Sequence, residues 1–155
     1  TIFLGAMLSL LVCLMFTGCS NSETNSTSRG LTDFAHIEEE YLATIDSLNW
    51  PDGITLPDKL EDEDTGASFQ VGYGETRASY LWEYSWMKEW LDTYNTDPER
   101  AEKALEELEK AFDMPYMGID RCDDATRNYL RENIDKAKLG DPSGFTESIR
   151  ANYAN

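Results

Sequence analysis

A single carboxylate, Glu83, lies inside the most aromatic segment of the chain. At about 100° per residue, as in an α-helix, Glu83 falls in the same arc as the tryptophans and tyrosines of residues 75–94, together with Ser79. Burial of a carboxylate costs free energy unless the group is paired, and it raises the pKa toward the range that suits acid–base catalysis. Glu83 is therefore the candidate catalytic residue. The alternative is that Glu83 lies at the rim of the helix face or pairs with an arginine from another helix.

Hydrolysis of a glycoside requires two carboxyl groups at a suitable separation. The acidic run at residues 61–64 supplies candidates for the second group, Asp62 and Asp64. The sequence does not fix the distance between either aspartate and Glu83. A small hydrolase that uses Glu83 with a loop aspartate is thus one of two functional hypotheses.

The same acidic run offers oxygen ligands to a hard cation such as calcium. The candidate ligands are Glu61, Glu63 and Asp64. Counting from Glu61 as the first ligand of an EF-hand places Gly66 correctly, but it puts Gly72 at the position that requires a glutamate. A solvated acidic loop explains the run better, and the sequence predicts neither a metal site nor a cofactor.

The tryptophans and tyrosines allow two interpretations. Trp82 and Trp86 recur at helical spacing and are typical of a core-facing stripe, because large aromatic side chains dominate small cores. The same side chains could instead form an exposed platform for a glycan or a partner protein. Trp50 and Tyr73 lie at predicted loop positions, which makes them the better candidates for exposed binding residues.

The charge of the chain excludes one class of partner. Its 155 residues include 30 acidic and 13 basic side chains, which give a formal net charge of −17. A protein that binds nucleic acid must supply lysine and arginine to neutralise phosphates, so nucleic acid is not expected as a partner. The single histidine, His36, excludes a metal site made of several histidines. A hydrophobic content of 41% is too high for a disordered chain, and the length fits one domain.

Residues 1–16 are uncharged and mainly apolar, about as long as the core of a signal peptide and short for a membrane span. They lack a starting methionine and a basic segment, so we expect the true start of the signal to lie upstream. The next residues, Phe16-Thr17-Gly18-Cys19, resemble the lipobox of bacterial lipoproteins. The resemblance implies that residues 1–18 are cleaved as a signal peptide and that Cys19 carries a diacylglyceryl group. Such a group would hold the protein at the extracytoplasmic face of the cell membrane.

Residues 20–30 read SNSETNSTSRG and contain no apolar side chain. Segment 19–30 is therefore predicted to be a lipidated cysteine followed by a flexible tether. In the mature chain only Cys122 stays free, because Cys13 leaves with the signal peptide and Cys19 carries the lipid. No intramolecular disulfide is then possible, and the acidic domain of residues 31–155 must be held together by its core.

Apolar residues recur at steps of three and four in several segments after the tether, which predicts helices. These segments are 31–50, 75–94, 98–112, 121–139 and about 143–153. Pro51 to Gly74 show no helical period and predict one long loop, with a short extended piece at Phe69 to Val71. The sequence therefore predicts an all-α fold, a small bundle of four to five helices.

Two turns and the aromatic helix carry a further resemblance. Trp50-Pro51-Asp52-Gly53, Gly72-Tyr73-Gly74 and the helix that follows are together similar to uncharacterised exported proteins of Gram-positive actinobacteria, over about Trp50 to Leu91. The resemblance implies a Gram-positive source. It implies no activity.

The leading functional hypothesis is a lipid-anchored binding or interaction module outside the cell membrane. Its partner would be an envelope protein or a glycan, bound through the 51–74 loop and the aromatic residues near it. The anchor, the tether and the lack of a convincing catalytic set favour this hypothesis. The hydrolase described above is the alternative, and the sequence does not decide whether the chain is an enzyme.

Overall fold

The chain folds as a small helical bundle, which confirms the predicted all-α class. The structure is a computed structural model that describes residues 30–61 and 63–153. Its elements are β1 (Leu31–Thr32), α1 (Phe34–Ser47), β2 (Phe69–Gln70), α2 (Tyr73–Thr93), α3 (Pro98–Glu109), the 3-10 turns η1 (Lys110–Asp113) and η2 (Pro115–Met117), α4 (Asp124–Lys138) and α5 (Ser143–Asn152). Within these ranges, no helix has the length and apolar content needed to cross a membrane. The predicted signal peptide, Cys19 and the tether up to residue 29 lie outside the described residues, as does Asp62.

Aspartates mark the beginning of three helices. Asp33, Asp97 and Asp123 each accept a hydrogen bond from the backbone N–H three residues later, at 3.0, 3.2 and 2.7 Å. Each bond satisfies an amide of the first turn that has no partner within the helix. Because Asp123 is the cap, α4 begins at Asp124 and not at the predicted residue 121.

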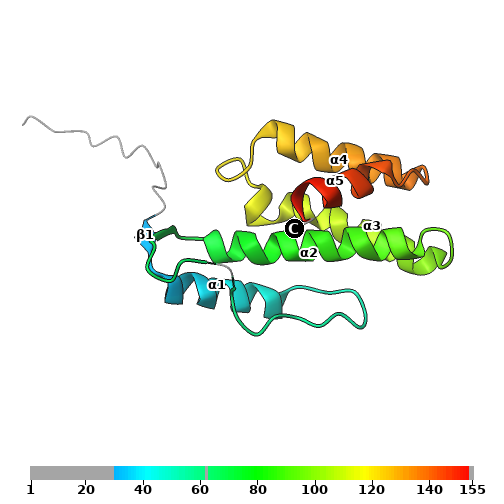
Figure 1. The fold of residues 1–155 in the computed structure, drawn as a ribbon. Coiled ribbons are helices and arrows are strands. Elements are labelled where there is room, and N and C mark those ends of the chain that lie inside the picture. Colours follow the sequence, from blue (N-terminus) through cyan, green and yellow to red (C-terminus); the bar gives the residue numbers. More distant parts are fainter. Residues whose placement is uncertain (1–29, 62, 154–155) are drawn as a thin grey trace, which may run out of the picture.

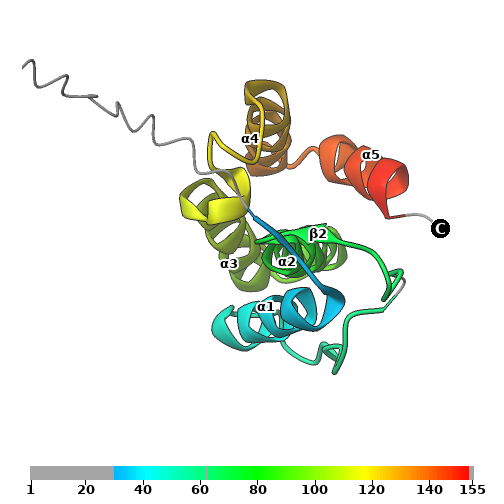
Figure 2. The same ribbon diagram turned by 90° about the vertical axis from the view of Figure 1, so that its left-hand side faces the viewer.

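Helix α2 is the central element of the bundle. Figures 1 and 2 show α1 on one side of α2, with α3, α4 and α5 on the others. The indoles of Trp82, Trp86 and Trp90 are at most 2% exposed and form the main core together with apolar residues of α3, α4 and α5. A second cluster, which includes Ile37 and Ile45, lies between α1, α2 and the loop that connects them.

Helices α1 and α2 are in backbone contact at Gly74. A Cβ atom on Gly74 would lie 1.8 Å from the carbonyl oxygen of Ile37, so this contact admits no side chain. Next to it, the Glu40 carboxylate accepts hydrogen bonds from the backbone N–H groups of Gly72 and Gly74, at 2.7 and 3.1 Å. These amides belong to the start of α2 and lack a partner within the helix. A carboxylate of α1 therefore caps α2.

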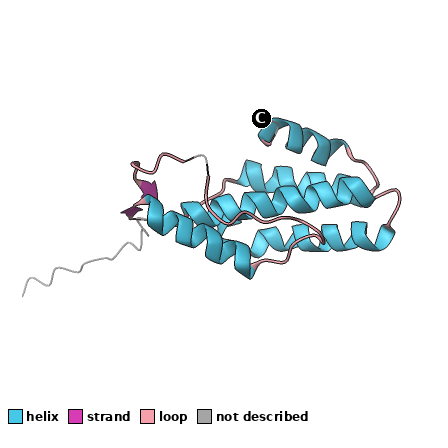
Figure 3. Ribbon diagram, turned by 60° about the horizontal axis from the view of Figure 1, so that its bottom comes forward, coloured by secondary structure: helices cyan, strands magenta, loops and turns pink. Residues whose placement is uncertain are grey.

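The long loop predicted after the first helix connects α1 to α2 (Figure 3). Leu60, in the middle of this loop, is 5% exposed and belongs to the cluster between α1 and α2. Strand β2 pairs antiparallel with β1, so that Phe69 lies opposite Thr32. The short extended piece that the sequence predicts at Phe69 to Val71 corresponds to β2.

The first residues of the loop are attached to α2 through one backbone carbonyl. The carbonyl oxygen of Asn49 accepts hydrogen bonds from the indole N–H groups of Trp82 and Trp86, at 2.8 and 3.1 Å. The neighbouring Trp50 donates its indole N–H to the carbonyl of Ile45, at 2.9 Å. Buried indoles need such partners, so these bonds let the tryptophans enter the core without a loss of hydrogen bonding.

Candidate functional site

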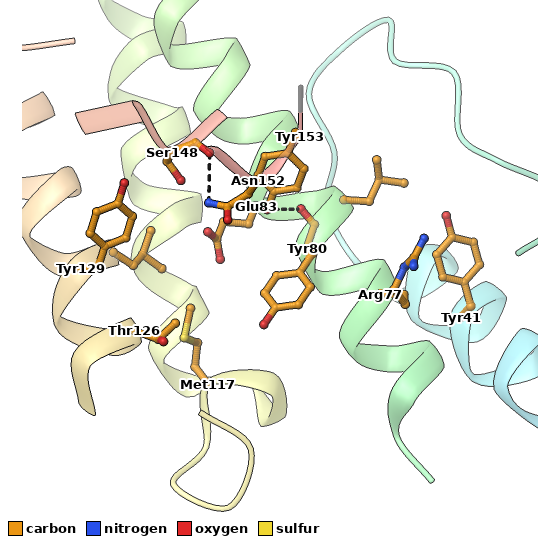
Figure 4. Close-up of a pocket in the computed structure, with 12 residues that line it drawn as sticks. Tyr41, Arg77, Tyr80, Glu83, Met117, Thr126, Tyr129, Ser148, Asn152 and Tyr153 are labelled. Atoms are coloured by element: carbon orange, nitrogen blue, oxygen red, sulfur yellow. Dashed lines mark hydrogen bonds between the residues drawn. The ribbon is translucent and has the colours of Figure 1, made fainter. Parts of the chain in front are cut away.

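A cavity of about 710 Å³ lies between α2, α4 and α5. Residues of α1, α2, η2, α4 and the end of α5 line it. They are Tyr41, Arg77, Tyr80, Leu81, Glu83, Met117, Thr126, Tyr129, Leu130, Ser148, Asn152 and Tyr153. Figure 4 shows Tyr129, Thr126 and Met117 at one end, Arg77 and Tyr41 at the other, and Glu83 between them. Cavities of this size are typical of small-ligand sites.

Glu83 is the carboxylate that α2 contributes to the lining of this cavity. It is only 7% exposed, so the carboxylate is buried and does not lie at the rim of the aromatic arc. Burial raises the pKa of Glu83 to about 7, although the hydrogen bond from Tyr116, which stabilises the charged form, acts in the opposite direction. The carboxyl group therefore changes its charge near neutral pH, which an exposed glutamate does not do.

The partner of Glu83 is a tyrosine. The hydroxyl of Tyr116, in η2, donates a hydrogen bond to Oε2 of Glu83 at 2.7 Å. Glu83 therefore lies neither at the rim of the helix face nor, among the described residues, in an ion pair with an arginine. The structure shows no donor for the second oxygen, Oε1, within those same residues. One carboxylate oxygen is bound inside the fold, and the other is without a donor in a side chain that lines the cavity.

Phenol groups surround Glu83. Tyr80 and Tyr129 line the cavity and are each 41% exposed. The hydroxyl of Tyr153 donates to the carbonyl of Tyr80 at 3.3 Å (Figure 4). The pKa values of Tyr80, Tyr116 and Tyr153 are raised above the ordinary value. Burial is the largest cause, and the negative charge of the nearby Glu83 is the second. Tyr80, Tyr116 and Tyr153 are therefore neutral near pH 7 and place aromatic rings but no charge beside Glu83.

A pair of carboxylates for hydrolysis is not found in the described lining. Glu83 is the one carboxylate among the residues that line the cavity. Asp64, the described candidate for a second group, accepts the backbone N–H of Gly66 at 2.9 Å and does not belong to the lining. Asp62 lies outside the described residues. The arrangement supports binding around one titratable group better than catalysis by two.

The candidate metal ligands have partners within the protein. Glu61 forms an ion pair with Lys59 at 2.8 Å. Glu63 accepts from Arg77 at 2.6 Å and from the hydroxyl of Tyr73 at 2.7 Å. In the described ranges, 30–61 and 63–153, no group of three or more His, Cys, Asp or Glu side chains could hold a metal ion.

The aromatic candidates divide between core and loop contacts. Trp82 and Trp86 are each 1% exposed, so the interpretation as an exposed platform is wrong for both and the core interpretation holds. Trp50 is half-buried and packs against both apolar clusters. The hydroxyl of Tyr73 is bound to Glu63. The aromatic surface near Glu83 comes instead from Tyr80, Tyr129 and Tyr153, which the sequence reasoning did not single out as binding residues.

Comparison of the chain with protein-family models, with curated proteins and with solved structures found no match. The geometry of the cavity and the charge of the chain are therefore the observations that bear on function. The features that matter are a buried carboxyl group with one free oxygen, a ring of neutral phenols, and a cavity large enough for a small organic molecule.

Proposed function

We propose that the chain is a lipid-anchored protein of the bacterial cell envelope whose helical domain binds a small ligand in the Glu83 cavity. The observation that carries the binding role is the free oxygen Oε1 of a carboxylate that is otherwise buried. Keeping a carboxylate away from water costs free energy, and its hydrogen bond to Tyr116 repays part of that cost. A ligand that completes the hydrogen bonding of Oε1 explains why the position is not apolar.

The anchor part of the proposal rests on the lipobox. Two or more acyl chains hold a protein at a membrane stably, whereas the acidic domain itself would be repelled by anionic lipid. The loop expected to carry binding has its aromatic groups engaged with the fold, which moves the proposed contact from residues 51–74 to the cavity. The hydrolase alternative would need a second carboxyl group beside Glu83, and the described lining does not supply one.

The lipid on Cys19 can be tested by labelling. Cells that express the whole precursor are grown with an alkyne-tagged palmitate, and the purified chain is examined for the label. We expect labelled wild-type protein in the membrane fraction and no label in Cys19→Ser. Cys122→Ser is the matched control and should be labelled like the wild type. Equal labelling of Cys19→Ser would contradict the anchor.

Binding in the cavity can be tested by closing it. Thr126 lines the cavity, whereas its neighbour Ala125 is exposed and does not line it. We expect Thr126→Trp to abolish the amide shifts that bound fragments cause at residues 126–130 and 148–153 in a nuclear magnetic resonance screen. Ala125→Trp should leave them unchanged. The screen includes ammonium ions, carboxylates, alcohols and sugars, and fragments that shift these amides equally in all three proteins would argue against a site in the cavity.

A further inference from the structure

The chemistry around Glu83 points to one class of ligand, and this step rests on the proposed function. We infer that the cavity binds a primary alkylammonium ion, with Oε1 of Glu83 as acceptor of its N–H groups and the rings of Tyr80, Tyr129 and Tyr153 around its alkyl part.

The free oxygen selects a donor. Oε2 of Glu83 is bound by Tyr116, so Oε1 is the acceptor that remains at the cavity. A carboxylate is a hydrogen-bond acceptor only, and its bonds to charged N–H donors are stronger than those to neutral ones. An anionic ligand would place a second negative charge against Glu83. A quaternary ammonium ion has the right charge but no N–H to donate.

The charges of the lining agree with a cation. Two charged residues line the cavity, Glu83 and Arg77. The guanidinium of Arg77 is paired with Glu63 at 2.6 Å, and Figure 4 shows Arg77 beside Tyr41 and apart from Glu83. A ligand near Glu83 therefore meets an uncompensated carboxylate and not the arginine. The net charge of −17 also raises the local concentration of cations around the molecule.

The aromatic walls agree with a cation that carries an alkyl chain. Tyr80, Tyr129 and Tyr153 line the cavity, and the raised pKa values of Tyr80 and Tyr153 keep these two phenols neutral. The faces of neutral aromatic rings attract organic cations, most strongly where water is excluded. Leu81, Met117 and Leu130 also line the cavity and suit the alkyl part of the ligand.

The test compares ligands that differ in one group. The probes are n-butylammonium, 1-butanol, butyrate and tetramethylammonium, titrated at pH 8 into the whole chain as purified from the cells that express it, with amide shifts as readout. We expect n-butylammonium to bind at least tenfold more tightly than each of the others. Glu83→Gln should reduce its affinity at least tenfold. Glu39→Gln, which removes the same charge from an exposed position of α1, should leave the affinity within about twofold.

Two further measurements separate a specific site from diffuse attraction. Tyr129→Leu keeps an apolar side chain and removes a ring, and we expect about a fivefold loss of affinity for n-butylammonium. Lowering the pH from 8 to 5.5 should weaken binding about tenfold, because Glu83 becomes protonated. The other groups that face Glu83 are Tyr80, Tyr116, Tyr153 and Cys122, whose pKa values are raised and which stay neutral across this range.

The outcomes are distinct. Binding of 1-butanol or butyrate that equals that of n-butylammonium, and that Thr126→Trp abolishes, would overturn the ammonium inference and leave the cavity as a binding site. Equal losses of affinity for n-butylammonium in Glu83→Gln and Glu39→Gln would overturn it as well, because they would show that the net negative charge attracts the cation without a specific site. If Thr126→Trp abolishes no amide shift of any fragment, both the binding function of the cavity and the ammonium ligand are overturned. The amide spectrum of each variant shows whether it folds. If Glu83→Gln does not fold, the loss of affinity in Tyr129→Leu tests the inference in its place.

Discussion

Alanine in place of Gly74 is expected to lower the free energy of unfolding by about 3 kcal/mol or more, measured by urea denaturation with tryptophan fluorescence. The added methyl group would lie 1.8 Å from the carbonyl oxygen of Ile37 and 2.9 Å from the backbone nitrogen of Tyr41. Both are backbone atoms of α1, so no side-chain rotation relieves the overlap. The whole helix has to move away from α2.

Movement of α1 would also stretch the hydrogen bonds from Gly72 and Gly74 to Glu40. Alanine favours a helix over glycine by about 1 kcal/mol, so the expected loss occurs despite a local gain. Gly66→Ala is the matched control, because its Cβ would meet only a side-chain oxygen of Asp64 at 3.4 Å. We expect a change within about 0.5 kcal/mol there. A loss below about 1 kcal/mol in Gly74→Ala would show that α1 shifts freely.

The second large effect concerns the pH dependence of stability. The pKa of Glu83 rises from 4.5 to about 7 in the folded protein. As the pH rises from about 4.5, the unfolded chain loses this proton while the folded chain keeps it, so folding becomes less favourable until the pH passes about 7. Each unit of difference in pKa corresponds to about 1.4 kcal/mol, so Glu83 alone lowers the free energy of unfolding by about 3 kcal/mol between pH 4.5 and pH 8.

Glu83→Gln isolates this effect from the many other carboxylates of the chain. Glutamine stays neutral at every pH, and its side-chain carbonyl can accept the hydroxyl of Tyr116. We expect the stability of Glu83→Gln relative to the wild type to improve by about 3 kcal/mol from pH 4.5 to pH 8, from urea denaturation at each pH. Glu39→Gln should show no such trend. If the free energies of unfolding of Glu83→Gln and the wild type change in parallel with pH, the pKa of Glu83 is not raised by folding.

Periodicity and turn residues were enough to predict the main elements. The steps of apolar residues placed the helices within a few residues of their observed bounds, and the prolines and glycines after Trp50 located the loop. The same spacing placed Glu83 within the aromatic arc of the helix, but it left open whether the carboxylate is buried, lies at the rim or pairs with an arginine. These features depend on residues close together in the sequence, which is why the sequence alone reveals them.

Contacts between distant residues could not be predicted in this way. The partner of Glu83 is Tyr116, 33 positions away in a short 3-10 turn that has no period of its own. The cap that Glu40 provides for α2 joins residues 32 and 34 positions apart. The walls of the cavity come mainly from α2, α4 and α5, with Tyr41 of α1 and Met117 of η2, so the cavity depends on how distant helices pack together. Neither composition nor spacing encodes such distances directly.

The shared acceptor of the two buried indoles has an evolutionary consequence. Trp82 and Trp86 donate to the backbone carbonyl of Asn49, and every amino acid supplies that atom equally well. Selection therefore acts on the position of the chain at residue 49 and hardly on the identity of its exposed side chain. We therefore expect that related sequences, once compared, vary at residue 49 and retain tryptophan at the positions of Trp82 and Trp86.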